Sequence, residues 1–226
     1  MAPSLVVVPP FLPYQLYVID GGLSTQLSNL GHPELDSDPL WTARALVSAP
    51  DTVVRAHRDF LAAGARVLIT NSYQVSVEGF KEHLGLDERA TRRAVTTSVE
   101  LAWRAVREEG LVAGEVVVGG SVGPWGACRH DGSEYRGGYE RGLGREALAE
   151  WHRPRVEALV EGRASVLALE TLPSSLEALA VMDCVLEASP SLPLWVSFTV
   201  KEGACLGGGE GVGEAVKVVL GHPLAR

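Results

Sequence analysis

Short apolar runs rich in β-branched residues alternate with longer stretches of helical periodicity along this chain. The apolar runs predict five buried strands, at residues 16–20, 66–70, 115–119, 166–170 and 194–199. The longer stretches predict amphipathic helices at 51–63, 87–109, 145–160, 175–187 and 212–220, with the third interrupted near Pro154. Because the strand runs are apolar on both faces and alternate with helices, the pattern predicts a parallel α/β fold.

Polar residues and glycines follow each predicted strand on its carboxyl side. Active sites of parallel barrels and open α/β sheets lie at that face. Five such clusters in register therefore predict an enzyme-like pocket, and the absence of a strand–glycine–helix dinucleotide fingerprint favours a barrel. The glycine-rich run at 207–213 fits neither that fingerprint nor a phosphate loop, and we expect it to be a flexible surface loop.

Composition narrows the class of partner. The chain has 226 residues and a formal net charge of −8, which argues against nucleic acid or an anionic membrane as a partner. No Lys or Arg precedes Arg44, and no apolar run approaches the length of a membrane span. Three cysteines do not form a disulfide framework, so we expect a cytoplasmic protein. Residues 1–15 predict an irregular lead-in, and residues 16–226 predict one domain.

Two carboxylates end predicted strands in equivalent places. Asp20 is followed by Gly21 and Gly22, whose bare backbone N–H groups allow a carboxylate to approach closely, and Glu170 ends the fourth strand. Two acids at one rim suit the ammonium group of an amino acid. The neighbouring polar side chains that suit its carboxylate are Asn71, Ser72 and Gln74. The alternative is that each acid caps a helix or pairs with an arginine.

Trp41 follows the loop after the first predicted strand. A tryptophan there is able to bind an onium group through a cation–π contact worth about 1–2 kcal/mol, or to pack in the core after Pro39. The histidines form no triad and lack metal-site spacing, and Ser121 and Ser197 have no evident base. We therefore predict no catalytic side chain and no metal ligand from spacing alone.

Eight segments in order carry a family resemblance. They are residues 20–22, 38–41, 72–74, 120–124, 131–137, 152–155, 170–173 and 197–199. With them the chain resembles the homocysteine S-methyltransferases, most closely the S-methylmethionine-dependent branch. The resemblance covers residues 16 to about 223.

The resemblance implies a fold, a reaction and site residues. The fold would be an incomplete (β/α)8 TIM barrel with about the first five strand–helix units. The reaction would transfer a methyl group from S-methylmethionine, or S-adenosylmethionine, to L-homocysteine to give methionine. In the substrate site, Asp20 and Glu170 would bind the substrate amine and Gly21 and Gly22 its carboxylate. Ser72 and Gln74 would lie beside the substrate, and Trp41 on the donor side.

The resemblance also implies a zinc ion that this sequence does not provide for. The family takes three zinc cysteines from later strands, whereas Cys128, Cys184 and Cys205 stand at other positions. A free thiol titrates at about 8.5 and is therefore mostly protonated at neutral pH, and a zinc site would keep the substrate sulfur deprotonated. We therefore expect a C-terminally truncated isoform that binds no zinc and is inactive alone. The alternative is a non-catalytic fragment that binds an amino acid or associates with full-length chains.

Overall fold

The computed structural model describes residues 16–225, so the predicted lead-in at 1–15 lies outside the described residues. Its helices and strands in chain order are α1 (Leu23–Asn29), the 3-10 helices η1 (Pro33–Ser37) and η2 (Trp41–Arg44), α2 (Ala45–Ser48), α3 (Pro50–Ala62), β1 (Val67–Ile69), α4 (Val77–Leu84), α5 (Glu88–Glu108), β2 (Val117–Val122), η3 (Trp125–Arg129), α6 (Ser133–Arg136), α7 (Glu140–Glu161), β3 (Val166–Leu172), α8 (Ser175–Ala188), β4 (Leu194–Phe198), β5 (Val200–Lys201), β6 (Cys205–Leu206), α9 (Val212–Leu220) and η4 (Pro223–Ala225).

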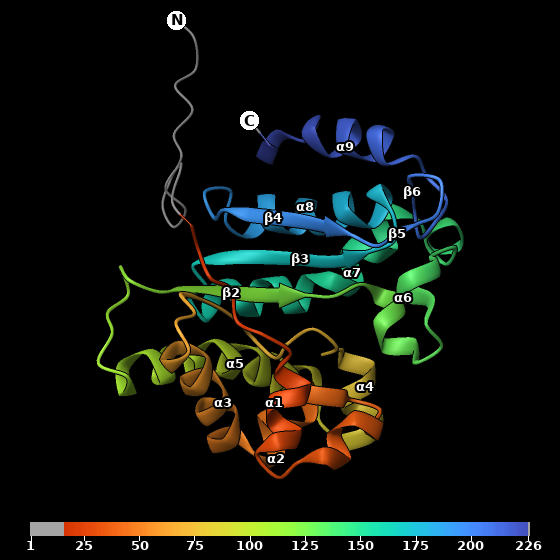
Figure 1. Ribbon diagram of the computed structural model, residues 1–226. Helices are drawn as coiled ribbons and strands as arrows, with labels where there is room; N and C mark the ends of the chain where they lie inside the picture. The colour runs from red at the N-terminus through yellow and green to blue at the C-terminus, as the bar shows by residue number, and fades with distance from the viewer. Residues whose placement is uncertain (1–15, 226) are drawn as a thin grey trace, which may run out of the picture.

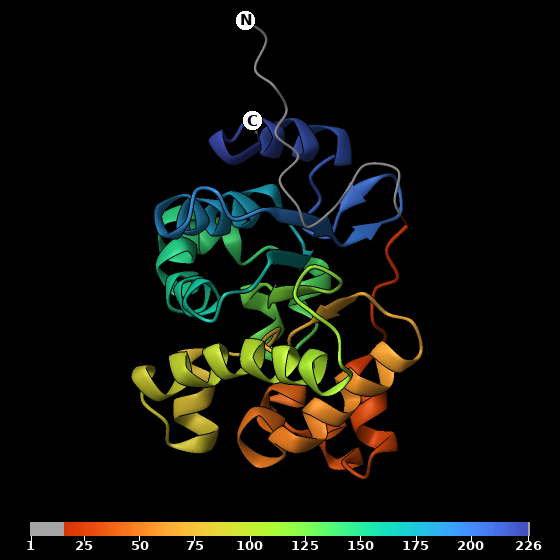
Figure 2. The same cartoon turned by 90° about the vertical axis from the view of Figure 1, so that its left-hand side faces the viewer.

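Four parallel strands form the central sheet, in the order β1-β2-β3-β4 (Figure 1). Helices α5, α7 and α8 lie on one side of it, as Figure 2 shows. The opposite face carries a smaller apolar cluster around Val67, Val117 and Val166. Strands in sequence order, each returned by a helix on the same face, are the arrangement of a (β/α)8 barrel, so the α/β prediction is confirmed.

The prediction of a strand at residues 16–20 is wrong. Ile19 makes only an isolated parallel bridge to Val67, although Val18 O accepts the N–H groups of Arg66 and Val67. Leu16 and Val18 are 96% and 57% exposed. The segment lies against β1 on one edge, and without burial of its side chains it does not continue as a regular strand.

Strand β2 extends further than the predicted 115–119, through two glycines. A Cβ at Gly119 would lie 2.8 Å from Ile69 Cδ1, and one at Gly120 would lie 3.0 Å from side-chain atoms of Leu159 and Leu167. The glycines therefore do not end the strand. They let apolar side chains from both faces close over it.

The third predicted helix, 145–160, is not interrupted near Pro154, so this part of the prediction is wrong. Helix α7 begins at Glu140 and passes through Pro154, whereas Gly144 has non-helical angles of φ 77° and ψ 167°. Proline removes one helical hydrogen bond, but α7 packs along α8 and α5, and this packing holds the helix together across Pro154. Gly144 breaks the helix because glycine adopts positive φ without strain.

The glycine-rich run at 207–213 is not a free surface loop. Gly207 N–H donates to Thr199 O at 2.9 Å, and Gly208 N–H donates to Pro173 O at 2.8 Å. Glu210 accepts hydrogen bonds from both the N–H and the hydroxyl of Ser175. The run therefore holds the turn between β3 and α8 in place.

Within residues 16–225, none of the helices has the length and apolar character of a membrane span.

His57 in α3 predicts a pH-dependent stability. Its side chain is fully buried, neither ring nitrogen has a partner in the described part of the chain, and burial lowers its pKa to about 4. As pH falls from 6.5 to 4 the unfolded chain binds this proton first, so the free energy of unfolding decreases. We expect His57→Leu to gain stability over the wild type as pH falls, by about 3 kcal/mol at the acid end of this window. Urea unfolding across that range checks this, and a pH-independent difference would contradict it.

Candidate functional site

A cavity of about 610 Å³ opens at the carboxyl ends of the strands. The turns after the 18–20 segment, β1, β2 and β3 each contribute polar side chains to it, and the loop carrying α6 closes one side. Of the predicted site residues, those lining the cavity are Asp20, Gly21, Trp41, Asn71, Gln74 and Glu170. Gly22 and Ser72 are the two that do not line it.

Gly22 and Ser72 have structural positions next to the cavity. Gly22 is the N-cap of α1. Ser72 is fully buried, and its hydroxyl donates to Ser121 O at 2.8 Å, which ties the turn after β1 to β2. A hydroxyl that is already used in this way is poorly placed to donate to a ligand.

Asp20 is fixed by the neighbouring strand. Its Oδ2 accepts the N–H of Ile69 at 2.8 Å, and its own N–H donates to Val67 O at 2.9 Å. Burial raises the pKa of the Asp20 carboxyl to about 7; the hydrogen bond from Ile69 opposes this rise, and the Glu170 carboxylate adds to it. Asp20 and Glu170 both line the cavity.

Glu170 lies near the end of β3 and accepts a hydrogen bond from the Ser121 hydroxyl through Oε1. Burial raises the pKa of Glu170, and the bond from Ser121 opposes this. The next residue, Thr171, also lines the cavity and has φ 65°, a left-handed conformation unusual for a β-branched residue. Two acids that are expensive to ionise without a partner are suited to bind a cation.

An aromatic pair lies on the cavity wall. The rings of Trp41 and Tyr73 meet edge to face, with centroids 6.2 Å apart, and Trp41 has φ 46°. Tyr73 packs so closely on Gly123 that a Cβ there would lie 2.5 Å from its ring. Sequence reasoning did not assign Tyr73 to the site; the signals for it were its place after the β1 turn and the glycine at 123.

In the side-chain amides of Asn71 and Gln74, the oxygen atoms and not the N–H groups are left without a hydrogen-bond partner among residues 16–225. Asn71 Nδ2 donates to Thr42 O at 3.2 Å and Gln74 Nε2 donates to Ala127 O at 2.7 Å. Asn71 Oδ1 and Gln74 Oε1 are buried and have no partner among residues 16–225. Both amides therefore add hydrogen-bond acceptors to the site.

The cavity is strongly acidic. Three carboxylates that sequence reasoning did not assign also line it, namely Asp36, Asp38 and Glu134. Asp38 pairs with Arg44, and Asp36 accepts from Ser24 and Ser28. The only basic side chain on the wall, within the described residues, is His130. An acceptor-rich cavity of this charge selects a cationic ligand.

The cysteines do not fit a zinc site. Cys128 Sγ donates to Gln74 O, and Cys184 Sγ donates to Ala149 O inside the helix pair α7–α8, whereas Cys205 lies in β6. Burial raises the pKa of both the Cys128 and Cys184 thiols, the latter to about 11, so neither favours the thiolate that binds metal. No group of three His, Cys, Asp or Glu side chains in the described chain is placed to hold a metal ion.

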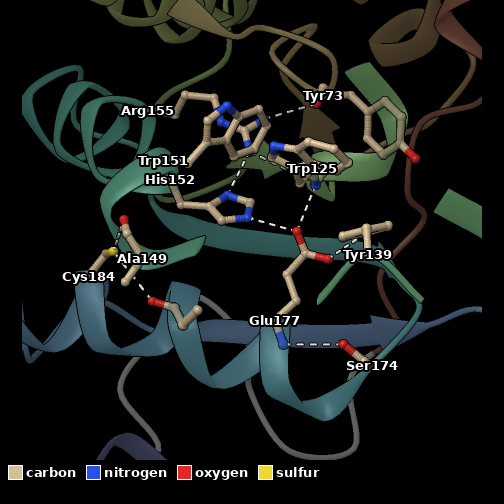
Figure 3. Close-up of polar contacts among 12 residues, drawn as sticks. Tyr73, Trp125, Tyr139, Ala149, Trp151, His152, Arg155, Ser174, Glu177 and Cys184 are labelled. Atoms are coloured by element: carbon tan, nitrogen blue, oxygen red, sulfur yellow. Dashed lines mark hydrogen bonds and ion pairs between the residues drawn. The ribbon is translucent and has the colours of Figure 1, made fainter. Parts of the chain in front are cut away.

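A buried charged network lies behind the cavity (Figure 3). Arg155 donates to Tyr73 O, to Gly123 O and to His152 Nδ1, so His152 carries its proton on Nε2 and donates it to Glu177 Oε1 at 3.0 Å. Burial lowers the pKa of His152 to about 4; Arg155 adds to this and Glu177 opposes it. The network ties the turns after β1 and β2 to α7 and α8.

Glu177 is the centre of this network. Its Oε1 also accepts the N–H of Trp125 at 2.7 Å, and its Oε2 accepts the hydroxyl of Tyr139 at 2.6 Å. The side chain is completely buried. The wall of the cavity that carries Tyr73 therefore depends on contacts made outside the cavity.

Comparison with known proteins agrees with this geometry. A profile described as homocysteine S-methyltransferase matches residues 17–225. The chain is 42% identical to the homocysteine S-methyltransferase of Escherichia coli over 92% of its own length and 66% of that protein. It is 39% identical to a Drosophila melanogaster betaine-homocysteine S-methyltransferase, covering 86% of this chain and 61% of that protein.

A solved structure also matches. The metallated form of the homocysteine methyltransferase MmuM from Escherichia coli superposes with a TM-score of 0.83 at 39% identity, over 93% of this chain and 73% of that one. Among curated relatives, the chain spans 61% of the Drosophila melanogaster protein, 66% of the Escherichia coli protein and 60% of a Bacillus subtilis homocysteine S-methyltransferase, which is less than two thirds of each. On the match over residues 17–225, the chain belongs to the homocysteine S-methyltransferase family.

Proposed function

We propose that the cavity binds homocysteine as the acceptor of a methyl group. The ammonium group of homocysteine lies between Asp20 and Glu170, and its carboxylate meets the backbone at Gly21, next to the N-terminal end of α1. The observation that carries this proposal is that two partly buried acids, Asp20 after the 16–19 segment and Glu170 in β3, line one acidic cavity. Neither acid is paired with an arginine or lysine in the described chain, so neither shows the ion pair that the alternative required.

The proposed reaction moves a methyl group between two sulfur atoms. The homocysteine sulfur forms a bond to the methyl carbon, the bond from that carbon to the donor sulfonium breaks, and the donor leaves as a neutral thioether. The thiol proton passes to solvent, and the products are methionine and the demethylated donor. The protein's contribution is to align the two sulfurs on either side of the methyl group.

The donor is a sulfonium compound, S-methylmethionine or S-adenosylmethionine. Trp41 and Tyr73 offer aromatic surfaces on the cavity wall, where a cation–π contact is worth about 1–2 kcal/mol when water is excluded. The acidic lining favours a donor with net positive charge.

Binding without turnover is the second candidate for this chain. The three cysteines contact separate elements and supply no thiolate cluster, so no step of the reaction is assigned to a metal here. The described residues would then bind amino acids, or associate with a longer chain of the same family that supplies the metal.

The test combines three measurements on the 226-residue protein. Calorimetric titration should show binding of homocysteine and of S-methylmethionine. Elemental analysis measures bound zinc, and mass spectrometry measures the methionine formed. Absence of homocysteine binding would overturn the proposed site. Chelator-sensitive methionine formation would support methyl transfer by this chain, whereas less than stoichiometric zinc with no methionine above the blank would support binding without turnover.

A further inference from the structure

Glu134 is a carboxylate on the cavity wall that neither the resemblance nor the proposed acceptor site uses. It lies in α6, and its Oε2 is buried with no hydrogen-bond partner among residues 16–225. A buried carboxylate oxygen that receives no hydrogen bond is unfavourable. The group is therefore suited to receive a donor from a ligand.

The backbone around Glu134 is held in place. Glu134 O accepts the hydroxyl of Thr199, and Ser133 Oγ donates to Gly126 O at 3.3 Å. A Cβ at Gly126 would lie 2.7 Å from Glu134 N, so this approach requires glycine. The carboxylate is thus presented to the cavity by a fixed loop.

Glu134 and Asp20 lie at different ends of the sheet. The backbone carbonyl of Glu134 accepts the hydroxyl of Thr199, which directly follows β4, whereas Asp20 accepts the N–H of Ile69 at the end of β1. Because the sheet has the order β1-β2-β3-β4, Asp20 and Glu134 line the cavity from opposite ends. Glu170 of β3 and the aromatic pair Trp41–Tyr73 line the same cavity.

The part of the cavity lined by Glu134 is suited to a cation that carries N–H groups, because its unpartnered atoms are acceptors. Gln74 also lines the cavity and has a second buried acceptor without a partner among residues 16–225, its Oε1; its amide N–H is held by Ala127 O in the loop before α6. Two unpartnered acceptors suit an ammonium group. A quaternary ammonium, such as betaine, has no N–H to give.

We propose that Glu134 binds the α-ammonium group of the methyl donor, so that the donor must be a sulfonium amino acid with a free amino group. This inference rests on the proposed function. Homocysteine and donor then lie in the cavity with their ammonium groups at opposite acidic ends and their sulfur atoms between them, beside Trp41 and Tyr73.

The test compares the binding of two ligands by the wild type and by a Glu134 variant, with each affinity measured by calorimetric titration. Glu134→Gln keeps the shape of the side chain and removes its charge, and the probes are S-methylmethionine and 4-(dimethylsulfonio)butanoate, which lacks only the amino group. We expect Glu134→Gln to weaken S-methylmethionine about tenfold and to leave the analogue within about twofold. Glu146→Gln, an exposed change of equal charge on α7 that does not line the cavity, should affect neither probe.

Homocysteine titration separates the possible failures. Unchanged homocysteine affinity in Glu134→Gln shows that the variant is folded and that the acceptor end is intact. Equal binding of S-methylmethionine by the wild type and Glu134→Gln would overturn the role of Glu134 and leave the acceptor site standing. Binding of neither homocysteine nor S-methylmethionine by the wild type would overturn both proposals.

Discussion

Replacing Asp20 with asparagine should weaken homocysteine binding about tenfold or more at pH 8 and stabilise the folded protein at the same time. The amide oxygen of asparagine retains the hydrogen bond from Ile69 N–H, so the change removes charge with little change in shape. Loss of the charge removes half of the acid pair that would hold the ligand ammonium. A change that increases stability and decreases binding indicates a residue selected for function.

The sign of the stability change follows from the raised pKa of Asp20. Between 3.8 and about 7 the unfolded chain releases this proton while the folded chain keeps it, so rising pH lowers the free energy of unfolding of the wild type. Above that window the full difference remains, on the order of 4 kcal/mol. We expect Asp20→Asn to exceed the wild type by that amount near pH 8 and to match it near pH 4.

Ligand binding should show the same titration. The affinity of the wild type for homocysteine should fall towards that of Asp20→Asn as pH decreases through 7, because protonated Asp20 attracts the ammonium group weakly. Asp20→Asn should lose most of this dependence. Urea unfolding and calorimetric titration at a series of pH values measure both effects, with Glu146→Gln as the charge-matched control. Equal stability of Asp20→Asn and wild type at all pH values would contradict the buried, unpaired carboxylate.

The second large effect is expected at Glu177. Glu177→Ala removes the acceptor for three donors, Trp125 N–H, His152 Nε2–H and the Tyr139 hydroxyl, and takes away a negative charge that acts on buried Arg155. Breaking a buried, hydrogen-bonded charge network by removing one member lowers the free energy of unfolding by about 3–5 kcal/mol. We therefore expect a loss of this size by urea or thermal unfolding.

A matched change on the same helix shows whether burial is the cause. Glu187 in α8 pairs with Arg153 at the surface, where its side chain is 57% exposed, and Glu187→Ala should alter stability by less than about 1 kcal/mol. Glu177→Gln, which retains a carbonyl acceptor, should fall between the two. If Glu177→Ala proved as mild as Glu187→Ala, the network of Figure 3 would not stabilise the fold.

The electrostatics of the site and of the network behind it are opposite in character. Glu177 is surrounded by donors, so its charge contributes to stability, whereas Asp20 and Glu170 are buried with few donors and are costly to ionise without a ligand. This contrast separates acids that hold the protein together from acids available to a substrate.

Four of the five predicted strands are confirmed, because short β-branched apolar runs are a local signal of burial on both faces. The run at 16–20 gives the same signal but lacks a covering layer, and so it makes only one bridge. Likewise, an interruption of the helix near Pro154 was expected because proline disrupts a helix locally. In the structure α7 packs against α8, and the helix continues through Pro154.

The sequence by itself determined the order of strands and helices and the types of side chain at the strand ends, since both depend on residues adjacent in the chain. Only the tertiary structure decided which atoms of those side chains remain available. Gln74 is an acceptor because Ala127, 53 residues away, takes its N–H, and Asp20 has its raised pKa because the fold buries it beside Glu170. Hydrogen-bond partners and desolvation are set by contacts between distant segments, so no local pattern contains them.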